Sequence, residues 1–195
     1  MRLMPTLLSI QVAQARRVQI EGRTILTAIH KQQVAGSVSV QRLGIDGDEQ
    51  ADLSVHGGLD KAVYAYPSEH YSFWQKVRAQ AGLTSIDEAF PYGSVGENLS
   101  LIGLLETDVW VGDVLKFTDC ELRVTLPREP CYKFNAAMGF NQAAKLMAQQ
   151  GCCGFYLAVD VPGQLRAGET FELLPGPRRL SIPESFKAKM FKHIR

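Results

Sequence analysis

The stretch from Glu121 to Lys133 reads ELRVTLPREPCYK, and it joins the clearest strand pattern of the chain to its most suggestive cysteine. Apolar residues at Leu122, Val124 and Leu126 alternate with polar ones, which predicts a half-buried β-strand. Two prolines then stiffen the backbone just before Cys131. We therefore expect a rigid loop that presents this cysteine where the strand leaves its sheet.

Similar short apolar runs recur on both sides of this stretch. They lie near residues 7–10, 38–40, 51–55, 62–66, 155–159 and 171–174. Gly, Asp and Pro separate them, which favours a mainly β protein with an antiparallel sheet closed or folded on itself. Helices are expected at about 68–81 with Ser68 as its cap, at 141–150 with Asn141 as its cap, and after Pro183.

Length and composition describe an ordinary globular domain. The 195 residues are 46% apolar and 21% charged, which predicts one domain over 1–195, with a core at about 5–175 and a short helical tail at 181–195. Lys and Arg number 21 against 20 Asp and Glu, so the net charge of +1 argues against a nucleic-acid polymer as partner. No apolar run is long enough to predict a membrane span.

Cysteine usage predicts reduced thiols and a cytoplasmic location. The four cysteines form no C-x-x-C pair, and the chain is not dense in cysteine. The N-terminal run near Leu7 reads better as a strand than as a signal peptide, because polar residues and Pro5 interrupt it. Cys120, Cys152 and Cys153 are expected to pack as small apolar residues.

Cys131 is the strongest candidate for chemistry. Arg128 and Lys133 place positive charge near its sulfur, which favours the thiolate. A thiolate on a rigid loop suits a nucleophile or a ligand of a soft metal. The alternative from the residues alone is a small buried apolar cysteine with surface cations beside it.

Two glycine-containing segments are weaker candidates. His56 precedes Gly57 and Gly58, with Lys61 close behind, and such a segment either binds an anion or moves a proton, or is simply a turn. The segment 92–100 contains Glu97 and Asn98 after glycines that can aim N–H groups at an anion, although alone it reads as a turn. The acidic run 46–50 lacks calcium-loop spacing and reads as a solvated turn.

These segments together resemble a known family. In order along the chain the matching segments are 47–52, 55–62, 66–71, 96–100, 112–113, 127–133 and 154–156. As a set they resemble the MOSC domain, the molybdenum cofactor sulfurase C-terminal domain, in its YiiM-like branch. The resemblance covers about residues 5–175.

The resemblance implies a fold, a cofactor and an activity. The fold is a β-barrel with a few peripheral α-helices, similar to the β-barrel domain of pyruvate kinase. The cofactor is molybdopterin with its molybdenum, and the activity is reduction of N-hydroxylated compounds such as hydroxylaminopurine-type bases, with electrons from a partner reductase. Cys131 would bind molybdenum and His56 would donate a proton. The cofactor-binding set would be Gly57, Gly58, Lys61, Glu97, Asn98, Arg128 and Lys133.

Departures from the family pattern leave other functions open. Leu126 stands where this branch usually has Gln, Ala158 stands where many relatives carry Arg, and the tail is short. A non-catalytic sulfur carrier or cofactor-binding module that uses Cys131, and a cysteine hydrolase that uses Cys131 with His56, are the alternatives. The lack of a long apolar run predicts no membrane partner, and a homodimer is left open.

Overall fold

The computed structural model describes residues 4–51 and 57–192. Its largest sheet has eight strands, mostly antiparallel, and β7 and β8 are a parallel pair within it. The order across this sheet is β13 (Glu172–Leu174), β9 (Val114–Lys116), β10 (Glu121–Pro127), β11 (Phe155–Val161), β7 (Val63–Pro67), β8 (Leu99–Ile102), β1 (Thr6–Val12) and β4 (Gln32–Gln33).

Two smaller sheets complete the β structure. One is ordered β12 (Gly163–Arg166), β5 (Ser37–Gln41) and β6 (Gly44–Ile45). The other is a hairpin of β2 (Arg16–Ile20) and β3 (Arg23–Thr27). The strands expected near 7–10, 38–40, 62–66, 155–159 and 171–174 are confirmed. The run expected at 51–55 lies almost wholly outside the described residues.

The large sheet curls toward closure, but no closed barrel is found among the described residues. The chain before β13 meets β1 through an isolated bridge between Thr6 and Thr170. The Leu7 N–H donates to the Glu169 carbonyl at 2.9 Å, and the Phe171 N–H donates to the Pro5 carbonyl at 3.0 Å. The mainly β class is confirmed, whereas the expected closed barrel is not, because these few contacts do not form a continuous ladder.

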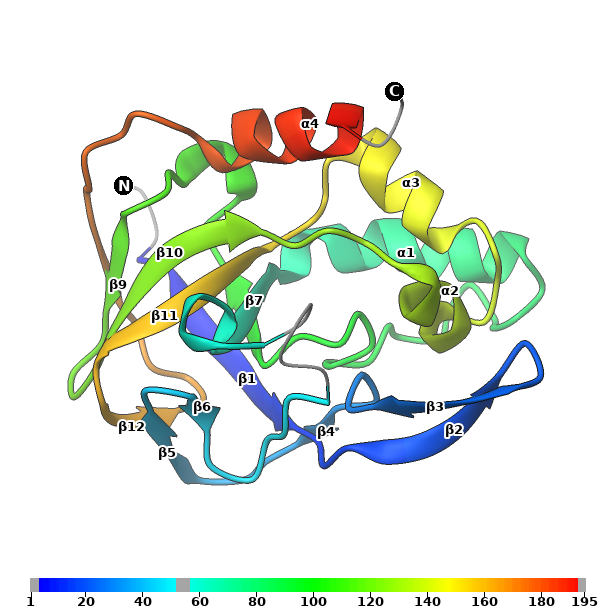
Figure 1. Cartoon of the computed structure of the whole chain (residues 1–195), viewed down its shortest axis with the longest axis horizontal. Coiled ribbons are helices and arrows are strands. Elements are labelled where there is room, and N and C mark those ends of the chain that lie inside the picture. Colours follow the sequence, from blue (N-terminus) through cyan, green and yellow to red (C-terminus); the bar gives the residue numbers. More distant parts are fainter. Residues whose placement is uncertain (1–3, 52–56, 193–195) are drawn as a thin grey trace.

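The helices lie outside the sheets, and three of them gather at one end of the molecule (Figure 1). They are α1 (Tyr71–Gln80), α2 (Tyr132–Met138), α3 (Ala143–Gln150) and α4 (Ile182–Lys192), with 3-10 turns η1 (Leu59–Lys61), η2 (Ser68–His70) and η3 (Glu106–Asp108). Trp74 of α1 is fully buried, and Gly151 in the left-handed conformation ends α3 as expected. No helix in the described part of the chain is long and apolar enough to cross a membrane.

Both expected side-chain caps are wrong, and helix α2 was not expected. Neither Ser68 nor Asn141 caps a helix; instead the Asn135 side chain of α2 accepts the Ala144 N–H of α3 at 2.8 Å. The cap therefore comes from a neighbouring helix, which local sequence spacing cannot reveal. The residues after Pro130, expected as loop, turn directly into α2 at Tyr132.

Helix α4 returns to the sheet and packs on β10. Ile182 and Phe186 are buried, and the Ile182 N–H donates to the Val109 carbonyl at 2.9 Å. Lys189 of α4 forms an ion pair with Glu129 of the Pro127–Cys131 loop. The short tail therefore braces the loop that carries Cys131.

Candidate functional site

A cavity open to solvent lies where β10 ends and α2 begins. Its described lining includes four cationic side chains, two carboxylates, two tyrosines and one cysteine: Lys31, Lys61, Arg128, Lys133, Asp48, Glu49, Tyr64, Tyr156 and Cys131. Positive charge thus exceeds negative charge, four groups to two, on this lining. Such a surplus favours an anionic ligand, since the low-dielectric walls strengthen each charge.

Cys131 is the one partly exposed cysteine, and it stands at the N-terminal end of α2. The other three are buried, and burial raises the pKa of the Cys120 and Cys152 thiols to about 12 and that of Cys153 well above its usual value. The expectation that these three pack as apolar residues is confirmed. Among the four, Cys131 alone lines the cavity, and it can meet a ligand there.

Arg128 is a buried cation held by aromatic rings. Its guanidinium carbon lies 5.2 Å from the Tyr64 ring centre and 4.8 Å from that of Phe134, and Nη1 is 3.5 Å from the Met147 sulfur. Among the described residues no carboxylate forms an ion pair with it. Burial lowers its pKa, but the electrostatic influence of Tyr64, Tyr156 and Cys131 outweighs this, and the net pKa is raised. Arg128 therefore keeps its charge beside Cys131.

Lys61 and Lys133 add positive charge at the cavity from different elements. Lys61 closes η1, and its ammonium lies 5.8 Å from the Tyr156 ring centre. Lys133 lies in the first turn of α2 and donates to the Leu26 carbonyl of β3 at 3.3 Å. That bond ties the β2–β3 hairpin to the helix that follows Cys131.

The structure describes Gly57 and Gly58, the two glycines before η1, but not the preceding His56. Gly58 adopts φ 92° and ψ 177°, a conformation that other residues avoid. Its N–H donates to the Gln50 side chain at 2.8 Å, and the Gln50 amide reaches back to the Leu43 carbonyl at 2.9 Å. Neither Gly57 nor Gly58 belongs to the described lining of the cavity. His56 lies outside the described residues, so its expected role stays a prediction.

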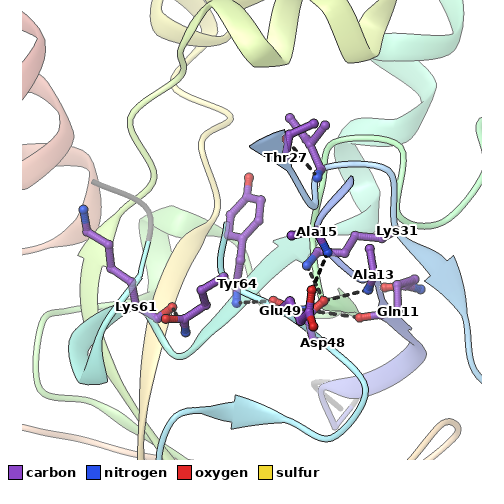
Figure 2. A network of polar contacts seen from close by, with 12 residues as sticks. Gln11, Ala13, Ala15, Thr27, Lys31, Asp48, Glu49, Lys61 and Tyr64 are labelled. Atoms are coloured by element: carbon purple, nitrogen blue, oxygen red, sulfur yellow. Dashed lines mark hydrogen bonds and ion pairs between the residues drawn. The ribbon is translucent and has the colours of Figure 1, made fainter. Parts of the chain in front are cut away.

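Asp48 is the centre of a polar network on the opposite wall (Figure 2). Its Oδ1 accepts the Ala13 N–H at 2.7 Å and the Lys31 ammonium at 2.5 Å, and its Oδ2 accepts the Asn98 amide at 2.9 Å. Burial lowers the pKa of Lys31, while Asp48 opposes this shift. The acidic turn expected to be solvated instead supplies a partly buried structural carboxylate at this wall.

The Asn98 side chain links β1, β7 and the acidic turn that carries Asp48, and both of its amide hydrogens are used. Its side-chain nitrogen donates to Asp48 and, at 3.1 Å, to the Gln11 carbonyl, while its oxygen accepts the Tyr64 N–H at 3.0 Å. It lines the cavity and is almost fully buried. Its hydrogen bonds therefore hold the wall together and leave no N–H of its side chain for a ligand.

Glu97 is buried behind that wall and is absent from the described lining of the cavity. Its carboxylate accepts the Gly93 N–H at 2.8 Å and the Val95 N–H at 3.1 Å, as well as the Tyr71 hydroxyl. Burial raises its pKa. Glu97 thus fixes the 93–96 turn by binding N–H groups that the sequence left available for an anion.

Sequence reasoning missed several lining residues. Lys31 belongs to no recognisable sequence motif, and its ion pair with Asp48 holds it at the cavity. Tyr64 and Tyr156 read as core strand residues, and no periodic signal marks a strand residue that also borders a cavity. Neither Leu126 nor Ala158, the two departures from the family pattern, is among the described lining residues.

Comparison with known proteins identifies the family of the chain. Residues 52–172, more than half of the chain, match the MOSC domain. The chain belongs to the MOSC domain family. YiiM of Escherichia coli (strain K12) is 36% identical over 159 residues, which cover 82% of this chain and 69% of YiiM. YflK of Bacillus subtilis is 34% identical over 178 residues, which cover 91% of this chain and 77% of YflK.

Solved structures place this MOSC protein close to YiiM. The crystal structure of YiiM from Geobacillus stearothermophilus matches with a TM-score of 0.75 and 30% identity, and the match covers 98% of this chain and 86% of that one. YiiM from Escherichia coli matches with a TM-score of 0.69 and 27% identity. A protein of Gibberella moniliformis named a reductase is 34% identical over 157 residues, which cover only 27% of its length. The YiiM-like resemblance read from the sequence is confirmed.

Proposed function

We propose that this MOSC domain protein binds a molybdenum cofactor and reduces N-hydroxylated compounds with electrons from a separate reductase. The observation that carries the proposal is the convergence of one partly exposed thiol and four cationic side chains on a single cavity. Membership of the MOSC family supports the cofactor, and the fungal relative named a reductase supports the reaction class.

The donor groups at the cavity match the chemistry of the metal and of the phosphate of this cofactor. A thiolate is the soft ligand that suits molybdenum, and Cys131 is the described sulfur at the cavity. The pterin carries a phosphate, which guanidinium and ammonium groups bind through charge-assisted hydrogen bonds. Arg128 has no carboxylate ion-pair partner among the described residues, so its charge is available for that phosphate.

The chain's own residues then divide the work of binding and positioning. Cys131 would hold the metal, while Arg128, Lys61 and Lys133 would hold the anionic end of the cofactor. When bound, the cofactor supplies a metal centre that can pass two electrons. The overall reaction takes R–NHOH, two electrons and two protons to R–NH₂ and water, so the N–O bond breaks and its oxygen leaves as water.

Proton delivery to the leaving oxygen requires a group at the cavity. His56 is the proposed donor, because an imidazole changes charge near neutral pH. In the sequence it directly precedes Gly57 and Gly58, and η1, whose Lys61 lines the cavity, follows them. A His56→Gln variant that loses turnover but keeps its molybdenum would separate this role from cofactor binding.

Elemental analysis tests the proposal directly. The full chain, Cys131→Ala and the matched control Cys120→Ala would be made in a host that synthesises the cofactor. We expect about one molybdenum per chain in the parent and control and a large loss in Cys131→Ala, because the soft ligand is gone. Equal molybdenum in all three proteins would refute the assignment of Cys131.

A sulfur carrier is the second candidate, and the exposure of Cys131 beside Arg128 favours it, since a persulfide needs an accessible, ionised sulfur. Mass spectrometry distinguishes the two functions. A gain of about 32 Da on Cys131 without molybdenum indicates the carrier, because that mass is one added sulfur atom. Turnover of a hydrolysable substrate by metal-depleted protein would instead indicate a cysteine hydrolase.

A further inference from the structure

A second, larger hollow lies beside the Cys131 cavity. Ile29 and Lys31 line both, and the end of α2 that carries Ala137 and Met138 reaches the second one. Ala137 lies six residues after Cys131, which at 1.5 Å per helical residue is about 9 Å. The cavity volume is about 890 Å³, against about 100 Å³ for the Cys131 cavity. The second hollow therefore has room for a whole heteroaromatic ligand.

Three aromatic rings form one side of this hollow. The Tyr71 ring centre lies 5.1 Å from that of Phe90 and 5.7 Å from that of Tyr92. Tyr71 donates its hydroxyl hydrogen to Glu97 and also lies within hydrogen-bond distance of the Ser100 hydroxyl. These contacts fix the first ring, whereas Tyr92 is 39% exposed. Exposed and fixed rings side by side offer faces on which a planar ring can stack.

The charge of the hollow is positive. Its lining cations are Arg78 and Lys31, of which Lys31 is already paired with Asp48, and no Asp or Glu is among its described lining residues. The third basic residue is His30, whose pKa is lowered by burial and by Arg16, so it adds little charge at neutral pH. Glu97, which accepts the Tyr71 hydroxyl, is buried and is absent from the described lining of the hollow.

Arg78 also has an unused hydrogen-bond donor. Its Nε is buried and has no hydrogen-bond partner among the described residues. Its guanidinium carbon lies 5.9 Å from the Phe90 ring centre, so the donor sits next to the aromatic side. The Arg78 side chain as a whole is partly exposed and lines the hollow, so its guanidinium can bind an anionic oxygen there.

We propose that this hollow binds a planar heteroaromatic ring that carries a phosphate, with the ring against Tyr92 and the phosphate on Arg78. The site adjoins the Cys131 cavity, with which it shares Ile29 and Lys31, but the proposal does not depend on the function proposed for that cavity. A nucleoside monophosphate and flavin mononucleotide share this chemistry, and they are the two sources that the experiment separates.

Binding to the full chain, with and without its cofactor, tests the proposal. Calorimetry with adenosine monophosphate and adenosine, and fluorescence with flavin mononucleotide, would be run on the parent, Arg78→Gln, Arg78→Lys and Tyr92→Ala. The matched controls are Arg166→Gln and Val161→Ala, which lie on other elements. Circular dichroism would establish that each variant is folded.

We expect at least one monophosphate to bind about tenfold more tightly than its unphosphorylated nucleoside. Arg78→Gln should abolish that advantage, Arg78→Lys should restore part of it, and Tyr92→Ala should weaken nucleotide and nucleoside alike by about fivefold or more. Of adenosine monophosphate and flavin mononucleotide, the one that binds more tightly identifies the class of ligand. If Arg78→Gln does not fold, Arg78→Lys still tests the phosphate contact and Tyr92→Ala still tests the ring contact.

Three results would overturn the proposal. The first is no binding of either monophosphate at millimolar concentration, and the second is binding that the Arg78 and Tyr92 variants leave unchanged. The third is loss of nucleotide binding on loading with the cofactor, which would show that the hollow belongs to the cofactor. The molybdenum content of Cys131→Ala bears on none of these results, so the two proposals fail independently.

Discussion

The two walls of the Cys131 cavity use polar residues in opposite ways. On one wall, Asp48 and Asn98 hydrogen-bond to each other, to backbone groups and to Lys31. On the other, Arg128 lies between two aromatic rings and a thioether sulfur, with no carboxylate ion pair among the described residues. On the first wall, Asp48 and Asn98 form their hydrogen bonds within the protein. The second wall presents the Arg128 charge and the Cys131 thiol to the cavity.

This difference separates residues that stabilise the cavity wall from residues whose side chains can bind a ligand. A buried hydrogen-bond network is costly to break, because each lost partner leaves a desolvated group unpaired. A buried cation without an ion pair contributes little to folding, since its desolvation offsets its contacts. Substitutions on the first wall should therefore lower the free energy of unfolding, and those on the second should chiefly lower ligand binding.

Asn98→Ala should have the largest effect on stability. It leaves the Tyr64 N–H, the Gln11 carbonyl and one Asp48 oxygen without their partner. We expect a loss of about 3 kcal/mol in the free energy of unfolding, at about 1 kcal/mol or more per stranded group. Urea denaturation measures it, with the exposed Asn141→Ala as control. Equal midpoints for the two variants would contradict the structural role of this wall.

Glu97→Gln should have the next largest effect, and it should depend on pH. The amide would set a donor against the Gly93 or Val95 N–H, at a cost of about 1–3 kcal/mol. The raised pKa means that folded Glu97 keeps its proton above pH 4.5, where the unfolded chain has lost it. The stability from this group is thus full below pH 4.5 and falls as the pH rises through the folded pKa.

Denaturation at several pH values checks this sign. The parent should lose unfolding free energy across that window, Glu97→Gln should lose less, and the exposed Glu88→Gln should behave as the parent does. A steeper fall in Glu97→Gln than in the parent would mean that the Glu97 carboxyl is ionised in the folded protein.

The sequence was sufficient for β1, β5, β7, β10, β11 and β13 and for the charge and thiol of the second wall, because these depend on local signals, whereas β2, β3, β8, β9 and β12 were not predicted. Alternation predicted β10, and cations spaced around Cys131 predicted the charged cavity residues Arg128 and Lys133, which the structure places there. The MOSC motifs added Lys61, which also lines the cavity. These residues lie within a few positions of a motif, so the sequence predicts their chemical role before the fold is known.

The first wall could not be predicted for the opposite reason. Lys31 meets Asp48 only when β4 and the acidic turn are brought together, and Asn98 meets Gln11 across 87 positions. Asn98 and Glu97 were expected to contact the cofactor, but their side chains accept or donate within the protein. A polar motif alone does not tell whether its partner is a ligand or a distant backbone group.

Arg128→Met should change stability little and binding strongly. Methionine has a similar length and suits the Tyr64, Phe134 and Met147 surroundings, so we expect the free energy of unfolding to stay within about 1 kcal/mol. Molybdenum content should fall about tenfold, because a charge-assisted contact to the cofactor phosphate is lost. Lys145→Met, on the exposed side of α3, is the control. A large loss of stability with unchanged molybdenum would make Arg128 a structural residue.

Cys131→Ala should have the smallest effect on stability of the four. The side chain is partly exposed at the start of α2 and loses one sulfur atom, so we expect a change within about 0.5 kcal/mol. The buried control Cys120→Ala should cost more, about 1 kcal/mol, because it leaves a small void in the core. If Cys131→Ala were the more destabilised of the two, the sulfur would belong to the packing of the chain, and the contrast between the two walls would fail at its central residue.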